Sequence, residues 1–348
     1  MRRLPVFLVV DVSESMAGDN LRSLQEGMER LIKTLRSDPY ALETAYLSVI
    51  AFAGRAKTLS PLVELVAFYP PRLPQGSGTS IGGALEHLMD EIDRNIKRSS
   101  AEQKGDFKPL VFLMTDGKST DDMNAALSRW KRDYASRVNL VAVGIGRHAD
   151  LQGLSNIAEN VLRIEAATEQ EFKRFIDWIS ASVSSQSRSV SAGEPSRVNL
   201  AKLDDSIMKK IDSIAQATAV DEDFVIVIGK CQTNKLPYLM KFEKMQQDVS
   251  TRDFRVDASV YNLIGVYAAE RDFEELSDPR ANARTINTDA LLGAPGCPHC
   301  GAPIAFAMCG CGQVFCVKGQ GMATCPGCHC DIEMRQSEGG FDVTRGRG

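Results

Sequence analysis

The sequence predicts an α/β protein whose first half is a doubly wound, mostly parallel sheet, followed by a smaller strand-rich domain. Two observations predict the sheet. Continuous apolar runs recur through residues 4–184, as they do in strands that are covered on both faces. Amphipathic segments with helical spacing fill the intervals between these runs. This alternation indicates parallel strands that are joined by crossover helices.

The apolar runs give the expected strands, and the amphipathic segments give the expected helices. Buried strands are predicted at residues 4–10, 45–52, 109–115, 138–145 and 161–164. Helices are predicted at about 21–36, 80–98, 121–136, 150–159 and 169–183. The weaker run at 56–63 follows Gly54 and suits an antiparallel strand at the edge of the sheet.

The second half of the chain has a different composition. We place the first domain at 1–184 and a serine-rich linker at 185–199, because a run so rich in serine buries little apolar surface. Residues 200–295 are predicted to form a small α+β unit. It begins with an apolar stripe at helical spacing, formed by Leu200, Leu203, Ile207, Ile211 and Ile214. Strands are predicted to follow at 224–232, 237–244 and 258–270. A zinc-ribbon-like module at 296–332 and a flexible tail at 333–348 complete the chain.

The composition is that of a globular protein without a general attraction to nucleic acid. The 348 residues carry a net charge of −4, and the pI is about 5.7. No apolar run reaches the roughly 20 residues that span a bilayer, and the first run ends at Asp11, too early for a signal peptide. We therefore expect a cytoplasmic protein with no membrane partner. In that compartment the nine cysteines are expected to bind metal rather than form disulfides.

Oxygen-bearing side chains follow three of the predicted elements. Asp11, Ser13 and Ser15 come directly after the first strand, and Asp116 ends a later strand. Thr79 lies in a glycine-rich loop that opens a helix. Because ligands of an open α/β sheet bind beyond the carboxyl ends of its strands, we expect these side chains to meet there. Carboxylate and hydroxyl oxygens suit Mg²⁺ or Mn²⁺.

Other interpretations of these residues remain open. Ser13 or Ser15 could simply cap the helix that begins near residue 20. Asp11 could be a phosphoryl-accepting nucleophile, as in haloacid dehalogenases, but Ser13 stands where such enzymes usually carry a second acid. The loop around Thr79 could cradle a phosphate, although it lacks the Gly-Lys-Ser/Thr ending of a P-loop.

The D-x-S-x-S motif, the later threonine and the strand-terminal Asp-Gly together resemble the metal-ion-dependent adhesion site of von Willebrand factor type A domains. The resemblance covers about residues 1–184 and implies a Rossmann-like α/β fold. It also implies that Ser13, Ser15 and Thr79 ligate Mg²⁺ directly, with Asp11 and Asp116 often acting through water. A coordination position then stays open for an acidic side chain of a partner protein.

The cysteines near the C-terminus predict zinc. Two C-P-x-C pairs, Cys297 with Cys300 and Cys325 with Cys328, have the spacing of zinc knuckles, and we expect them to form one closed, structural site. The remaining cysteines could supply a second zinc, with His299 or His329 as further ligands; they are Cys309, Cys311, Cys316 and Cys330. Cys231 lies alone in an apolar run and is interpreted as a core residue.

The order of these parts resembles the tellurium-resistance TerY family. The resemblance rests on the run at 224–244 and its continuation to the cysteine cluster, and it extends over nearly the whole chain. It implies a bacterial cytoplasmic protein that works with a PP2C-like protein phosphatase and a protein kinase in stress or metal resistance.

Three classes of function follow. We expect a non-enzymatic adaptor that captures an Asp or Glu of a partner through Mg²⁺. A metal-dependent phosphohydrolase is an alternative, but neither His87 nor His148 neighbours a plausible nucleophile in the sequence. A zinc-containing subunit of a nucleic-acid-processing complex is another alternative. It is disfavoured because Lys318 is the only basic residue from 297 to 330.

Overall fold

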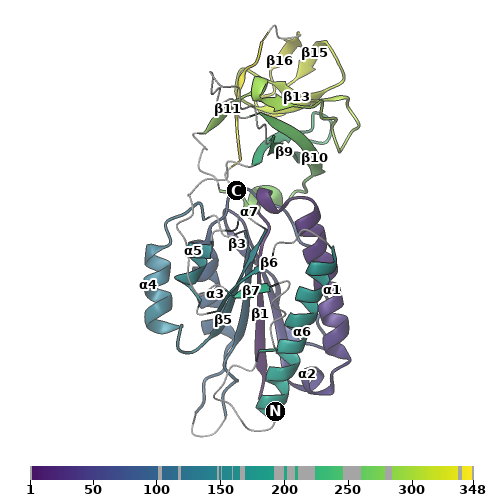
Figure 1. Ribbon diagram of the computed structural model, residues 1–348. Coiled ribbons are helices and arrows are strands. Elements are labelled where there is room, and N and C mark those ends of the chain that lie inside the picture. Colours follow the sequence, from purple (N-terminus) through teal and green to yellow (C-terminus); the bar gives the residue numbers. More distant parts are fainter. Residues whose placement is uncertain are drawn as a thin grey trace, which may run out of the picture. The chain divides into compact units, whose positions relative to one another are not determined.

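The computed structural model divides the chain into two compact units, Met1–Leu73 with Gly78–Ala219 and Pro74–Ser77 with Val220–Gly348 (Figure 1). The residues that it describes are 2–100, 104–116, 119–146, 149, 151–158, 160–164, 169–191, 200–201, 208–210, 224–245, 260–278, 284–335 and 339–346. Among these residues, no helix combines the length and the apolar character needed to cross a membrane.

The first unit is built on a seven-stranded sheet with the order β3-β2-β1-β4-β5-β6-β7. Its strands are β1 Leu4–Asp11, β2 Ala45–Phe52, β3 Ala56–Glu64, β4 Leu110–Thr115, β5 Asn139–Ile145, β6 Asn160–Ile164 and β7 Met208–Lys210. The strands from β2 to β6 run parallel, while β3 and β7 pair antiparallel at the two edges. The predicted α/β class, the buried strands and the antiparallel edge strand are thus confirmed.

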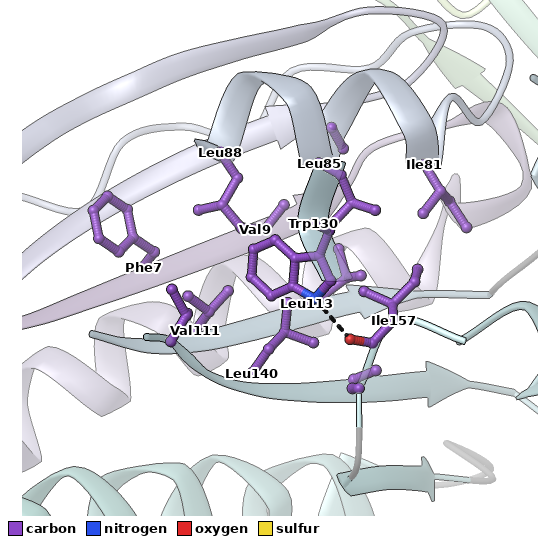
Figure 2. Packing of buried hydrophobic residues seen from close by; sticks show 14 of the residues in the cluster. Phe7, Val9, Ile81, Leu85, Leu88, Val111, Leu113, Trp130, Leu140 and Ile157 are labelled. Carbon is purple, nitrogen blue, oxygen red and sulfur yellow. Dashed lines mark hydrogen bonds between the residues drawn. The ribbon is translucent and has the colours of Figure 1, made fainter. Parts of the chain in front are cut away.

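Helices cover both faces of this sheet (Figure 1). One face carries α1 Asp19–Arg36, α2 Pro39–Thr44 and α6 Glu169–Ser191, and the other carries α3 Ile81–Asn95, α4 Asn124–Asp133 and α5 Leu151–Ser155. Figure 2 shows the second of these faces, where Trp130 of α4 packs among Leu85, Leu113 and Leu140. The indole N–H of Trp130 donates to the Ile157 carbonyl at 3.0 Å, so the buried polar atom of this ring is paired.

The predicted linker and the helix after it are both corrected. Helix α6 continues to Ser191, because Ser182, Val183 and Ser187 are buried along it and small side chains allow close helix packing. Residues 192–199 lie outside the described residues. Where a helical stripe was predicted at 200–214, Met208–Lys210 instead forms β7, which pairs with β6. The rest of that stripe, apart from Leu200, lies outside the described residues.

The second unit consists mostly of strands. Its six-stranded sheet has the order β12-β10-β9-β8-β14-β13, and β15 with β16 and β11 with β17 form two-stranded sheets. The strands are β8 Phe224–Lys230, β9 Pro237–Lys244, β10 Tyr261–Ala268, β11 Thr285–Asn287, β12 Leu291–Leu292, β13 Ile304–Met308, β14 Val314–Val317, β15 Gly321–Thr324, β16 Asp331–Met334 and β17 Asp342–Thr344. Helix α7 Phe273–Leu276 is a single turn.

Two predicted boundaries do not exist in the second unit. Strand β14, from the predicted zinc module, pairs with β8, from the predicted α+β unit, and the two regions share one hydrophobic core. The predicted tail is also part of this unit. Val343 of β17 is buried, and β17 pairs with β11 in an antiparallel register. Apolar residues in an otherwise polar segment, Phe341 and Val343, give the tail its contact with the core.

Candidate metal centres

Asp11 is fully buried at the carboxyl end of β1, and both of its carboxyl oxygens accept hydrogen bonds. The Ser13 N–H donates to Oδ1 at 2.9 Å, and the Thr115 hydroxyl, at the end of β4, donates to Oδ2 at 2.5 Å. Parallel pairing of β1 with β4 brings these two strand ends together. The contacts fix the orientation of the carboxyl group relative to the loop that follows it.

The loop after β1 carries the two serines. The hydroxyl oxygens of Ser13 and Ser15 lie 2.9 Å apart, and both side chains are buried. A short 3₁₀ turn, Glu14–Met16, holds them, since the Met16 N–H donates to the Ser13 carbonyl at 3.1 Å. Helix α1 instead has Gly18 as its N-cap residue, with no capping hydrogen bond from a side chain, so the interpretation of Ser13 or Ser15 as the cap of this helix is not supported.

Thr79 is fully buried at the start of the loop into α3, and its backbone is tied on both sides. Its N–H donates to the Thr120 hydroxyl at 2.9 Å, and its carbonyl accepts from the Thr120 N–H at 2.7 Å. The hydroxyl oxygen Oγ1 nevertheless has no hydrogen-bond partner in the described structure. Because a buried hydroxyl without a partner is costly, this atom is suited to a ligand that the protein itself does not supply.

Asp116 follows β4 and is partly buried. Burial raises the pKa of Asp11, and the charge of Asp116 raises it further, to about 8. The hydrogen bonds from Ser13 and Thr115 oppose this shift. The negative charges of two neighbouring carboxyl groups repel each other, and a bound cation would relieve their repulsion.

The donor set fits a hard divalent cation. Carboxyl oxygens from Asp11 and Asp116 and hydroxyl oxygens from Ser13, Ser15 and Thr79 are the groups that would hold Mg²⁺ or Mn²⁺. Asp11, Ser13 and Ser15 are joined by hydrogen bonds and are close in sequence. Asp116 lies close enough for its charge to raise the pKa of Asp11. The partnerless Thr79 hydroxyl is the observation that favours a ligand here.

Two further acids lie at this site. Glu14 is fully buried, and its Oε2 accepts from the Gly78 N–H at 2.6 Å. Asp121 accepts from the Ser80 hydroxyl at 2.6 Å and from the Gly83 N–H at 3.0 Å, so it caps α3. An acid between two serines, or one before a helix, usually lies in solvent, and the sequence carries no signal that these two are turned inward.

The cysteine thiols of the second unit gather into two tetrads. The sulfur atoms within each tetrad all lie within 4.8 Å of one another. The first tetrad is Cys231, Cys297, Cys300 and Cys316, and the second is Cys309, Cys311, Cys325 and Cys328. Four thiols at these distances could hold a tetrahedral Zn²⁺.

The first tetrad joins distant parts of the chain. Cys231 follows β8, and Cys316 lies on β14, which pairs with β8 at Lys230 and Phe315. The Sγ atoms of Cys300 and Cys316 are 3.6 Å apart, and the Gln232 N–H donates to Cys316 Sγ at 3.3 Å. Gly301 has a φ of 71°, a left-handed conformation that lets the chain turn back after Cys300.

The second tetrad is local. Cys309 and Cys311 lie at the turn between β13 and β14, and Cys325 and Cys328 lie between β15 and β16. The Sγ atoms of Cys309 and Cys328 are 3.5 Å apart, and those of Cys311 and Cys325 are 3.8 Å apart. Backbone N–H groups point at the sulfurs, with the Gly327 N–H 3.3 Å from Cys325 Sγ. Such bonds stabilise thiolates.

These tetrads correct the predicted zinc ligands. Cys297 and Cys300 do not share a site with Cys325 and Cys328. The turn of the β13–β14 hairpin brings Cys309 and Cys311 to the second knuckle, whereas Cys231 after β8 and Cys316 of β14 lie with the first. Cys231 is buried, as predicted, but its thiol belongs to the first tetrad. Cys330, His299 and His329 belong to neither tetrad. The imidazole Nε2 of His299 instead lies 2.8 Å from the Pro237 carbonyl.

The thiols within a tetrad differ in acidity. Burial acts to raise the pKa of Cys300, but the Ala302 N–H and the neighbouring thiols outweigh it and lower the pKa to about 7. The Cys311 N–H acts to lower the pKa of Cys309, but burial and hydrogen bonds with nearby thiols raise it to about 12. A metal that binds four thiolates must therefore displace protons, which makes its affinity depend on pH.

The fold and these donor groups define a class of protein: an α/β domain with an oxygen-ligand site at the carboxyl edge of its sheet, joined to a cysteine-rich metal-binding domain. The family model of the von Willebrand factor type A domain matches residues 6–179, half of the chain. The chain therefore belongs to the von Willebrand factor type A family. The model of the TerY-C metal binding domain matches residues 221–348, so the resemblance to both families is confirmed.

Solved structures from several organisms match parts of this chain. Proximal thread matrix protein 1 from the mussel byssus is 23% identical, with a TM-score of 0.38; the match covers 52% of this chain and 48% of that one. Another structure of that mussel protein has zinc in its metal-ion-dependent adhesion site. A von Willebrand factor type A protein from Catenulispora acidiphila is 15% identical over 81% of this chain and 70% of its own, with a TM-score of 0.42.

This chain thus spans about half the length of the mussel protein that it matches. The ArnB paralog VWA2 from Sulfolobus acidocaldarius is 10% identical, with a TM-score of 0.38, and the match covers 79% of this chain and 68% of that one. No curated protein matches the chain. The assignment to the family rests on the two family models.

Proposed function

We propose that this protein is a non-enzymatic adaptor that binds a partner protein through a Mg²⁺ ion, held by Asp11, Ser13, Ser15, Thr79 and Asp116. The observation that carries the proposal is the buried Thr79 hydroxyl, which has no partner in the described structure and lies beside a loop with two further buried hydroxyls. Mn²⁺ would suit the same oxygens.

The chemistry of the site favours an acidic partner. Hydroxyl ligands are neutral, so an ion held mainly by Ser13, Ser15 and Thr79 keeps much of its positive charge. Such an ion attracts an incoming Asp or Glu carboxylate strongly. The adaptor's own residues then orient the ion and leave one coordination position for the partner.

The zinc sites of the TerY-C domain have a structural role in this proposal. Its two tetrads would each hold one Zn²⁺ in a closed site, where no position is open for a substrate. By its resemblance to the TerY family, the protein would act in the bacterial cytoplasm with a PP2C-like phosphatase and a protein kinase, in tellurite or stress resistance. One domain would capture the first partner and the other domain the second.

Affinity capture with and without the metal tests the adaptor mechanism. The immobilised, zinc-loaded full-length chain is exposed to a PP2C-like phosphatase or a protein kinase of the same resistance system, in buffer with Mg²⁺ and then in buffer freed of Mg²⁺ and Mn²⁺ without a chelator. We expect capture with Mg²⁺, its loss without Mg²⁺, and its loss in Asp11→Ala and Thr79→Ala. Ser128→Ala, on the exposed face of α4, is the matched control and should bind as the wild type does. Capture that persists without Mg²⁺ and Mn²⁺ would contradict the metal bridge.

A second assay separates the adaptor from an enzyme. The purified chain is incubated with Mg²⁺ and with general phosphatase and nucleotidase substrates. We expect no turnover above that of the Asp11→Ala variant. Robust turnover that disappears in Asp11→Ala would overturn the adaptor proposal in favour of a phosphohydrolase.

A further inference from the structure

Glu14 is a buried acid between the two serines of the first loop, and the proposed metal binding does not use it. Its side chain is 0% exposed, although a carboxyl group is costly to bury without partners. Its Oε2 accepts a hydrogen bond from the Gly78 N–H at 2.6 Å. Gly78 lies 64 positions further along the chain and directly precedes Thr79. Glu14 thus reaches from the loop of Ser13 and Ser15 to the loop of Thr79.

The backbone around Thr79 is held from several sides. Gly78 has a φ of 86°, a left-handed conformation that glycine adopts without steric cost. On the other side of Thr79, the Ser80 N–H donates to the Ala53 carbonyl at 2.7 Å, and Thr120 bonds both backbone groups of Thr79. Glu14 supplies the contact on the N-terminal side. Among the described residues, the position of Thr79 Oγ1 is therefore set by hydrogen bonds of the backbone around it and by none of its own.

We infer that Glu14 is a positioning residue, which joins the two hydroxyl-bearing loops so that Ser13 and Ser15 stay aligned with Thr79 for a divalent cation. The inference rests on the proposed function, because it concerns the same metal site. Three hydroxyls from two loops must converge on one ion, and Mg²⁺ demands near-ideal octahedral geometry. A side chain that is anchored in one loop and bonded to the other fixes their separation before the ion arrives.

A pair of substitutions separates the hydrogen bond of Glu14 from its charge. Glu14→Gln keeps an oxygen that can accept from the Gly78 N–H, but it loses the negative charge. Glu14→Asp keeps the charge, but its shorter side chain cannot reach Gly78. If Glu14 acts by positioning, the Gln variant should bind metal nearly as the wild type does. The Asp variant should bind about tenfold more weakly, the loss expected for one buried hydrogen bond.

Mn²⁺ affinity is measured by titration calorimetry on the zinc-loaded full-length chain, and thermal unfolding is recorded in the same buffer before Mn²⁺ is added, without a chelator. The measurement without Mn²⁺ reports on folding alone, so the affinities are compared between variants that are folded at the temperature of the titration. Equal affinities in all three proteins, or a loss in Glu14→Gln as large as that in Glu14→Asp, would overturn the positioning role. Neither of those outcomes would contradict the metal site itself. Failure of the wild-type chain to bind Mn²⁺ would instead overturn the proposed function.

Discussion

The Thr79 hydroxyl and the Asp11 carboxyl group each add an unfavourable free energy to the folded protein when no cation is bound. Thr79 Oγ1 is buried without a hydrogen bond to any residue that the structure describes, and Asp11 is buried next to the charge of Asp116. A divalent cation relieves both costs at once, since it accepts the hydroxyl oxygen as a ligand and neutralises the carboxylates. Single residues at this site are therefore expected to affect metal binding more than folding.

Thr79→Val tests this expectation, because valine has nearly the shape of threonine and lacks the hydroxyl. We expect Mg²⁺ affinity to fall at least about tenfold, which corresponds to about 1.4 kcal/mol. The free energy of unfolding of the zinc-loaded chain in buffer without Mg²⁺ should stay unchanged or rise by up to about 1 kcal/mol, because a buried group without a partner is removed. Titration calorimetry and chemical denaturation measure the two quantities. A clear loss of stability without Mg²⁺ would show that the hydroxyl has a partner within the protein.

His87 on α3 predicts a pH dependence of stability. Burial lowers its pKa below the ordinary 6.5, and Arg94 adds to this, while Glu91 opposes it. The unfolded chain then binds a proton at a higher pH than the folded chain does. The stabilising contribution of the neutral ring is present above about pH 6.5 and is lost as the pH falls toward the pKa of the folded protein.

The measurement is the fall in melting temperature between about pH 7.5 and pH 5.5, in wild type and in His87→Gln. Glutamine can keep a hydrogen bond to the Thr58 hydroxyl, which lies 2.8 Å from His87 Nε2. We expect a smaller fall in the variant, because it has no imidazole to protonate. An equal or larger fall in the variant would contradict the lowered pKa of His87.

At the scale of elements, the sequence predicted those strands and helices whose own residues have a recognisable apolar pattern. Continuous apolar runs located the strands of the first sheet, and the ends of β1 and β4 could be recognised as places for ligands. Chain topology was not accessible in this way. The two C-P-x-C pairs look alike in sequence, and only the pairing of β14 with β8 and β13 shows that they belong to different tetrads. The serine-rich end of α6 was predicted to be a linker, because a helix that packs closely and a loop can both be rich in small residues.

Cys231→Ser tests the first tetrad, with Cys330→Ser as its matched control. Cys231 is a member of that tetrad, whereas Cys330 belongs to neither one. Since serine is a poor zinc ligand, we expect Cys231→Ser to lose about one of two bound zinc ions and to unfold at a lower temperature. Cys330→Ser should keep both ions. Metal analysis by mass spectrometry gives the stoichiometry, and full zinc content in Cys231→Ser would contradict the first tetrad as a site.

At the scale of the whole molecule, each unit has a hydrophobic core of its own. The cluster around Trp130 lies entirely in the first unit, and the clusters around Phe242 and Phe315 lie entirely in the second. The second unit is rich in short strands, and much of its core is built around cysteine side chains. Its folding should therefore depend on zinc, while that of the first unit should not.

Removal of zinc by a strong chelator is expected to unfold the second unit and leave the first one folded. Far-ultraviolet circular dichroism should then retain the helical signal, which comes mainly from the first unit. Limited proteolysis followed by mass spectrometry should show cleavage within residues 220–348 and protection of residues 2–191. Protection of both regions after chelation would show that zinc is not needed for the fold.

The two tetrads also differ in how much chain each one closes. In the second tetrad Cys309 and Cys328 are 19 positions apart, whereas the first joins segments such as Gln232 and Cys316, which are 84 positions apart. Closing the longer loop costs about 1 kcal/mol more in chain entropy, since each doubling of length adds about 0.6 kcal/mol. During synthesis the long loop has all four of its cysteines once Cys316 has emerged, whereas the short loop still needs Cys325 and Cys328, so the first tetrad can bind its ion before the second. The order of metal loading would then be the order of folding, and zinc supply would set how quickly this half of the protein matures.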